Sequence, residues 1–198
     1  MVELLDENPK LNVKNATEIL RNKDGLDNLH LGYGNEKALN QLLAHHAVIF
    51  SPQKKLVWVS SNPYQLGEFV CYDLNEIFSG KQLSQSLLAK TELNIARDPF
   101  ADSEEFQNYE LSKMYGKEIN EAADDKHTLL TDDVIPSYQA MNPDFWLVYY
   151  QSGKYYFSKK EYSKAKSAFE KALTKEITTV PDKKNVEKYL KKTLKKLK

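Results

Sequence analysis

The chain has 198 residues, 28% of them charged, and its 28 Lys and Arg residues equal its 28 Asp and Glu residues in number. This length suffices for one sizeable core, or for one core with a small appendage. A net charge near zero gives no general electrostatic reason to bind nucleic acid or membranes. Cys71 is the single cysteine, which excludes an intrachain disulfide and a cysteine-based metal site, so we expect neither a metal nor a cofactor.

The charges of this neutral chain are unevenly distributed. Residues 98–133 carry eleven acids against three lysines, and residues 183–198 carry eight lysines against one glutamate. Such charge runs usually form solvated faces. No apolar run approaches the ~20 residues that span a bilayer. The N-terminal residues lack the basic start and apolar core of a signal peptide, so we expect a soluble protein of unknown compartment.

The first third of the chain predicts two helices separated by a loop. Residues 14–21 have the pattern of a short helix that ends in turn-forming residues, and residues 26–34 are loop-like. Asn35 is placed to cap a second helix over residues 36–45. Its buried face would comprise Ala38, Leu39, Leu42 and Leu43.

Two strongly apolar segments follow, at residues 47–51 and 56–60. Both are rich in β-branched and aromatic residues, and a polar turn separates them. Their apolar residues are consecutive rather than alternating, which predicts a β-hairpin covered on both faces inside a layered domain. A third strand is predicted at residues 68–72, with a single helical turn at residues 73–78.

The middle of the chain predicts further helices. Residues 82–96 carry leucines at helical positions, and residues 102–105 resemble a capping box that opens a helix reaching residue 123. Residues 124–136, rich in acids and threonine, are expected to form a loop.

Residues 143–175 have the pattern of a two-helix hairpin. Small and aromatic residues recur at fixed offsets from a glycine, namely Gly153, Tyr156, Tyr162, Ala165, Phe169 and Ala172. The pattern resembles one tetratricopeptide repeat, although Ser152 replaces the usual leucine and Pro181 comes late. The cluster of tyrosines with Trp146 is accordingly expected in the hairpin core rather than on nucleic acid. A final helix is predicted over residues 182–198. Because one repeat cannot bury its own apolar surface, these helices should pack on the preceding domain or on a partner.

Residues 25–74 carry a second recognisable pattern, composed of Gly25-Leu26, Tyr33-Gly34-Asn35-Glu36, the AHHAVIF run at 44–50, Trp58-Val59-Ser60 and Pro63-Tyr64-Gln65-Leu66-Gly67. These residues resemble the C-terminal part of a cysteine-dependent autoprocessing acyltransferase/hydrolase. The family is that of acyl-coenzyme A:6-aminopenicillanic acid acyltransferase, which is related to choloylglycine hydrolases within the N-terminal-nucleophile superfamily. The resemblance covers these fifty residues well and the next sixty loosely.

The resemblance implies an α+β fold, a partial αββα sandwich over residues 1–136, followed by the tetratricopeptide-like hairpin and final helix over residues 137–198. It also implies hydrolysis or transfer of an acyl or amide group by a cysteine that becomes N-terminal after self-cleavage, with its α-amine as the base. The chain starts with Met1-Val2, and Cys71 lies inside an apolar strand. The resemblance therefore implies that an upstream segment or chain supplies the nucleophile, and that these residues are inactive alone.

Asn62, Tyr64 and Gln65 are the candidate substrate-binding residues. They follow a core strand, and loops at strand ends often line sites. The two amides could orient a substrate amide and Tyr64 could wall a pocket, but an Asn-Pro structural turn explains the same residues. No catalytic residue is assigned. His45 and His46 are adjacent, so their side chains point apart and cannot chelate one metal together in regular structure.

The alternative hypothesis is a non-enzymatic interaction module whose helical C-terminal region binds a partner peptide. The two hypotheses predict different behaviour of the isolated chain. A partial hydrolase should expose an apolar sheet edge or face and associate through it. An interaction module should remain monomeric and bind its partner through residues 143–198.

Overall fold

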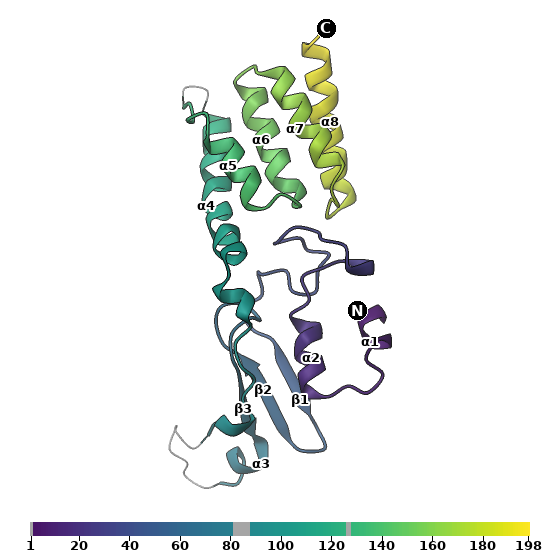
Figure 1. Cartoon of the computed structure of the whole chain (residues 1–198), viewed down its shortest axis with the longest axis vertical. Helices are drawn as coiled ribbons and strands as arrows, with labels where there is room; N and C mark the ends of the chain where they lie inside the picture. The colour runs from purple at the N-terminus through teal and green to yellow at the C-terminus, as the bar shows by residue number, and fades with distance from the viewer. Residues whose placement is uncertain (1, 81–87, 126–127) are drawn as a thin grey trace. The chain divides into compact units, whose positions relative to one another are not determined.

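The computed structural model describes residues 2–80, 88–125 and 128–198 (Figure 1). The chain forms two compact units, Met1–Asp27 with Ala38–Ser103 and Asn28–Lys37 with Glu104–Lys198. The first contains a small antiparallel sheet with short helices, and we call it the sheet unit. The second is built from helices and is called the helical unit. The protein is therefore a mixed α+β chain, as the sequence predicts.

The sheet unit is organised around three strands in the order β1-β2-β3, each antiparallel to its neighbour. The predicted hairpin, third strand and helical turn are confirmed. The elements from the N-terminus to residue 102 are α1 (Val2–Asp6), α2 (Val13–Leu20), η1 (Leu26–Asn28), β1 (Val48–Ser51), β2 (Leu56–Ser60), β3 (Phe69–Asp73), α3 (Leu74–Ile77), η3 (Thr91–Leu93) and η4 (Pro99–Asp102).

One face of the sheet is buried against α2. The register aligns Ile49, Trp58 and Cys71 across the three strands, and all three side chains are buried. The apolar side of α2, including Ala16 and Leu20, packs against this row. The amphipathic pattern of residues 14–21 thus forms the predicted helix and supplies the cover for the sheet.

The opposite face of the sheet is also apolar, and within the described residues its side chains on the edge strand β1 are exposed, whereas those on β2 and β3 are half-buried. Neighbouring residues of a strand point to opposite faces. The register therefore builds two apolar rows on this face, Val48–Val59–Val70 and Phe50–Val57–Tyr72. Val48 is 44% exposed and Phe50 is 67% exposed. The sequence predicted correctly that both faces of the sheet are apolar. It also predicted that other elements cover both faces, and this is wrong for the described part of the chain.

The helix predicted at residues 36–45 does not form. This segment consists of turns, and Leu42 adopts a left-handed conformation with φ 50°, which a right-handed helix cannot contain. The Asn40 side chain accepts the amide of Leu42 (3.0 Å), and the Asn40 amide donates to the carbonyl of Asn22 (2.8 Å). Ala38 and Leu42 are nevertheless buried. The apolar spacing thus predicted correctly that Ala38 and Leu42 are buried. The polar contacts of Asn40 determine the backbone conformation, which is not helical.

The helix predicted at residues 82–96 falls partly on residues 81–87, which lie outside the described residues. Residues 88–96 form no α-helix and instead run along β3. Phe69 and Ile95 exchange two backbone hydrogen bonds (2.9 and 3.0 Å), and the amide of Lys90 donates to the carbonyl of Cys71 (2.8 Å). The backbone groups of this segment are therefore satisfied by the edge of β3, which leaves β1 as the other edge strand.

The helical unit contains five helices among its described residues: α4 (Glu104–Asp124), α5 (Val134–Met141), α6 (Trp146–Ser158), α7 (Tyr162–Leu173) and α8 (Val180–Lys196). Each packs on the next along the chain, and α4 also packs on α6. The predicted long helix, two-helix hairpin and final helix are all present. The loop expected to end at Pro136 ends earlier, because Pro136 is accommodated in the first turn of α5, where its missing N–H removes no helical hydrogen bond.

The core of this unit contains buried residues of all five helices, and α6 and α7 meet within it. A Cβ placed on Gly153 would lie 2.5 Å from the ring of Phe169, so the glycine allows the aromatic ring to approach the helix backbone. Trp146, Tyr149 and Tyr155 are buried around this contact. The tyrosine-rich segment is thus the core of the hairpin, as predicted from its spacing.

Residues 28–37 belong to this core although they precede the sheet. The backbone of Tyr33 exchanges two hydrogen bonds with the side chain of Asn142 (3.0 and 2.8 Å). The fully buried Asn35 side chain donates to the carbonyls of Leu31 (3.3 Å) and Glu176 (2.9 Å). Asn35 therefore anchors a loop, and does not cap the helix that the sequence predicts after it.

Candidate functional site: a turn held by Arg21

The three candidate residues Asn62, Tyr64 and Gln65 lie together in the turn that joins β2 to β3. The Asn62–Pro63 peptide is cis, and Tyr64 has a left-handed backbone with φ 51°. The turn is closed by a hydrogen bond from the amide of Ser61 to the carbonyl of Glu68 (2.7 Å). Gly67 is required there, since a Cβ would lie 2.2 Å from the carbonyl oxygen of Ser61.

Arg21, at the C-terminal end of α2, holds this turn through its guanidinium group. Its Nε donates to the carbonyl of Gln65 (3.2 Å), and its Nη2 donates to the carbonyls of Leu66 (3.3 Å) and Gly67 (2.9 Å). The same Nη2 lies 2.9 Å from the carbonyl oxygen of Ala96, which ties the turn to the segment beside β3. The planar array of guanidinium donors makes such a multiple contact possible.

The environment of Arg21 is apolar on one side and acidic on the other. The guanidinium carbon lies 5.3 Å from the centroid of the Phe69 ring, and Nε lies 3.9 Å from the carboxylate of Asp98. Burial lowers the pKa of Arg21, and Asp98 opposes this shift. The pKa of Lys23 is lowered for the same reason, and its ammonium lies 4.3 Å from the Phe100 ring centroid. Arg21 remains charged at neutral pH, so its bonds to the carbonyls are charge-assisted.

Gln65 carries an unusual feature of the turn. Its side-chain Oε1 is buried and has no hydrogen-bond partner among the described residues. A buried acceptor without a donor costs about 1–3 kcal/mol, so a donor from outside this part of the chain would be favourable there. Asn62 is exposed, and Tyr64 is half-buried. The turn therefore brings together two amide side chains and a phenol, and it contains no cysteine or histidine.

The other reactive residues do not form a site with the turn. His45 and His46 are exposed, their ring centroids are 6.5 Å apart, and Nδ1 of His46 lies 3.1 Å from the carbonyl oxygen of Ser60. Cys71 is fully buried in β3, and burial raises the pKa of its thiol, which keeps the weakly nucleophilic protonated form.

The described residues form neither a metal site nor a membrane span. They contain no group of three or more His, Cys, Asp or Glu side chains that could hold a metal ion. Within the same ranges, no helix has the length and apolar character needed to cross a bilayer.

Sequence reasoning placed the three candidates on one turn but missed Arg21. The only available signal was a basic residue at the end of the helix predicted over residues 14–21, and nothing in that signal points to a turn more than forty positions away. No family model, curated protein or solved structure matches the chain.

Proposed function

We propose that this chain is the C-terminal portion of an N-terminal-nucleophile-type amide hydrolase or acyltransferase, whose cysteine nucleophile lies on sequence outside these residues. The observation that carries the proposal is the apolar face of the sheet that is exposed on the edge strand β1. Val48 and Phe50 of the edge strand are the most exposed residues of this face, at 44% and 67%.

The two faces of the sheet correspond to two kinds of neighbouring layer. Helix α2 covers the row of Ile49, Trp58 and Cys71, as a helical layer would. The rows that contain Val48 and Phe50 offer six apolar side chains in register, which is the surface that a second sheet packs on. An exposed apolar patch of this kind marks an interaction surface. In an αββα sandwich that surface would be covered by the facing sheet.

The turn at residues 61–67 would then contribute a wall of the substrate pocket. It lies at the end of β2, and Arg21 fixes its backbone through three consecutive carbonyls. The buried Oε1 of Gln65 would accept a hydrogen bond from a substrate amide or from the missing segment. Asn62 and Tyr64 would contact the substrate, and Arg21 would act as a positioning residue.

The first test is the association of the purified chain, measured by sedimentation velocity across a concentration series. We expect the wild type to associate, and the double variant Val48→Thr/Phe50→Thr to associate at least about tenfold more weakly, since threonine keeps strand propensity but removes apolar area. Phe78→Thr is the matched control, because Phe78 is 80% exposed in the same unit but lies outside the sheet face. A double variant that associates as strongly as the wild type would remove the support for the proposal.

The second test is catalytic. The purified chain should not hydrolyse acyl p-nitroanilides, because Cys71 is buried and protonated and cannot present an α-amine. Amide hydrolysis that persists in Cys71→Ala would contradict the proposed dependence on an external nucleophile.

One observation favours the alternative of a peptide-binding module. Side chains of α5, α6 and α7 line a groove of about 380 Å³ whose polar groups include Tyr149, Tyr156, Lys164 and Lys171. Tyr149 donates to the carbonyl of Pro143 (2.9 Å) and Lys164 pairs with Glu161 (2.6 Å), so Tyr156 and Lys171 are the groups that would contact the carboxylates of an acidic extended peptide. A monomeric chain that binds a poly-glutamate peptide, with affinity lost in Lys171→Ala, would favour this function over the hydrolase.

A further inference from the structure

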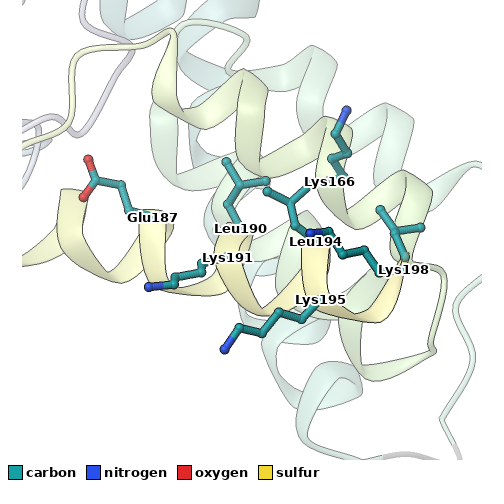
Figure 2. Close-up of a pocket in the computed structure, with 8 residues that line it drawn as sticks. Lys166, Glu187, Leu190, Lys191, Leu194, Lys195 and Lys198 are labelled. Atoms are coloured by element: carbon teal, nitrogen blue, oxygen red, sulfur yellow. The ribbon is translucent and has the colours of Figure 1, made fainter.

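The last helix leaves an apolar groove with a basic rim. Leu190, Leu194 and Leu197 of the C-terminal segment line it together with Lys166 of α7 and Lys191 and Lys195 of α8, and it encloses about 770 Å³ (Figure 2). Lys166 forms an ion pair with Glu170 (3.2 Å), whereas Lys191 and Lys195 form none within the described residues. Glu187 also lines the groove, one helical turn before Lys191, so the groove combines partly exposed leucines with a rim of four lysines and one carboxylate.

The shape of the groove favours a helix as its occupant. In a series of packed helices, each helix normally contacts a neighbour on both sides. Helix α8 packs on α7 and, to a lesser extent, on α6, and its inner side buries Val186 and Thr193. The surface formed by α7 and α8 is hollowed, which suits the ridge of another helix better than a flat membrane surface.

The opposite end of the helical unit carries a complementary ridge. The outward side of α4 presents Leu111 and Met114, which are 42% and 69% exposed, followed by Glu118 and Glu121 on the same side of the helix. Within this unit α4 and α8 flank the packed helices on opposite sides (Figure 1). Helix α4 carries six carboxylates against two lysines, and α8 carries seven lysines against two carboxylates.

We propose that α4 of one copy of this chain packs into the α7–α8 groove of another copy. Leu111 and Met114 would cover the groove leucines, and Glu118 and Glu121 would face Lys191 and Lys195. Because the two surfaces are different, the contact is heterologous and leads to head-to-tail assembly rather than to a closed two-fold dimer. The charges set the orientation and the specificity, and the leucines supply the buried area. The inference concerns the helical unit and does not depend on the proposed hydrolase function.

A charge-swap experiment in the full chain tests this contact. All proteins in this experiment carry Val48→Thr/Phe50→Thr, which removes association through the sheet. The result therefore tests only the contact between α4 and the groove, and it neither supports nor contradicts the proposed hydrolase function. The first variant adds Lys191→Glu/Lys195→Glu, and the second adds Glu118→Lys/Glu121→Lys. All four positions are exposed, so the fold should be retained, which far-UV circular dichroism checks.

Sedimentation equilibrium then gives three expected results. The parent associates, and raising the salt concentration weakens this association because exposed charges are screened. Each charge variant alone dissociates with a Kd at least about tenfold higher, since like charges now face each other. An equimolar mixture of the two variants recovers the affinity of the parent to within about threefold, because each contact again joins opposite charges.

Three results would overturn the inference. They are a parent that stays monomeric up to about 1 mM, charge variants that associate as tightly as the parent, and a mixture that shows no recovery. Any of these would show that the groove is not occupied by α4 of a second copy and would direct attention to an acidic helix of another protein.

Discussion

The sheet unit and the helical unit differ in how far each covers its own apolar surface. In the helical unit, Trp146 and Phe169 are buried by neighbouring helices of the same unit. In the sheet unit, Phe50 lies in register with other apolar residues and is nevertheless 67% exposed. Both units are rich in aromatic and β-branched residues, so composition does not explain the difference. The difference lies in the number of layers: the helices pack on both sides of their core, whereas α2 covers only one face of the sheet.

The chain offers a reporter for each unit, since Trp58 lies in the sheet and Trp146 lies in the helices. A Trp146→Phe background leaves tryptophan fluorescence to report on the sheet unit, and a Trp58→Phe background leaves it to report on the helical unit. Urea titrations of these single-tryptophan proteins therefore measure the stability of each unit separately.

The largest expected effect is the loss of Phe169 from the helical core. Phe169→Ala should lower the unfolding free energy reported by Trp146 by about 3–5 kcal/mol, because the ring is fully buried against Gly153 and Tyr189. Met114→Ala on the exposed side of α4 is the control and should change stability by less than about 0.5 kcal/mol. Equal effects of the two substitutions would contradict the assignment of this core.

The second effect concerns the sheet unit. Arg21→Ala should lower the stability reported by Trp58 by about 2–3 kcal/mol, because several backbone carbonyls lose a charged donor. Arg21→Lys should recover only part of this loss, since one ammonium cannot bond all of these carbonyls at once. Full recovery in the lysine variant would show that charge alone, rather than the planar array of donors, holds the turn.

The third effect is a loss of stability in alkali that is larger in the helical unit. Burial raises the pKa of Tyr138, and burial also raises the pKa values of Tyr149, Tyr150 and Tyr156. A raised folded-state pKa contributes stability that is fully present below the unfolded value near 10 and is lost as the pH rises above it. Each strongly shifted tyrosine adds a slope of about 1.4 kcal/mol per pH unit in that range. Trp146 should therefore report steeper destabilisation than Trp58 between pH 10 and 11.5, and equal slopes would contradict this expectation.

The smallest effect is a gain of stability in the turn between β1 and β2. Lys55 is exposed and adopts a left-handed conformation with φ 53°, which glycine adopts without steric cost. Lys55→Gly should raise the stability reported by Trp58 by about 0.5–1 kcal/mol. Gln53→Gly in the same turn is the control and should be neutral or destabilising, because it adds only freedom to the unfolded chain. If Gln53→Gly were more stable than Lys55→Gly, the backbone of Lys55 would not be strained.

Local patterns in the sequence predicted most of the elements, and long-range polar contacts account for the failures. The strands were predicted from runs of β-branched and aromatic residues, and the hairpin helices from small and aromatic residues at helical spacing. Residues 36–45 also have a helical apolar pattern, but Asn40 bonds the backbone of Leu42 and of the distant Asn22. Residues 88–96 pair with β3, which no local signal indicates. The turn of Asn62, Tyr64 and Gln65 could be located from its strand-end position, whereas its dependence on Arg21 required the fold.

The measurement that tests the central proposal most directly is the mass and the N-terminal residue of the native polypeptide. It would be captured from its source with an antibody against the lysine-rich segment at residues 183–198. We expect either a species heavier than 22.8 kDa or a co-purifying chain, with a processed N-terminus that begins with cysteine. Such a chain would supply the nucleophile and the sheet that covers Val48 and Phe50. A native product that begins at Met1, has a mass of 22.8 kDa and carries no partner chain would contradict the hydrolase proposal.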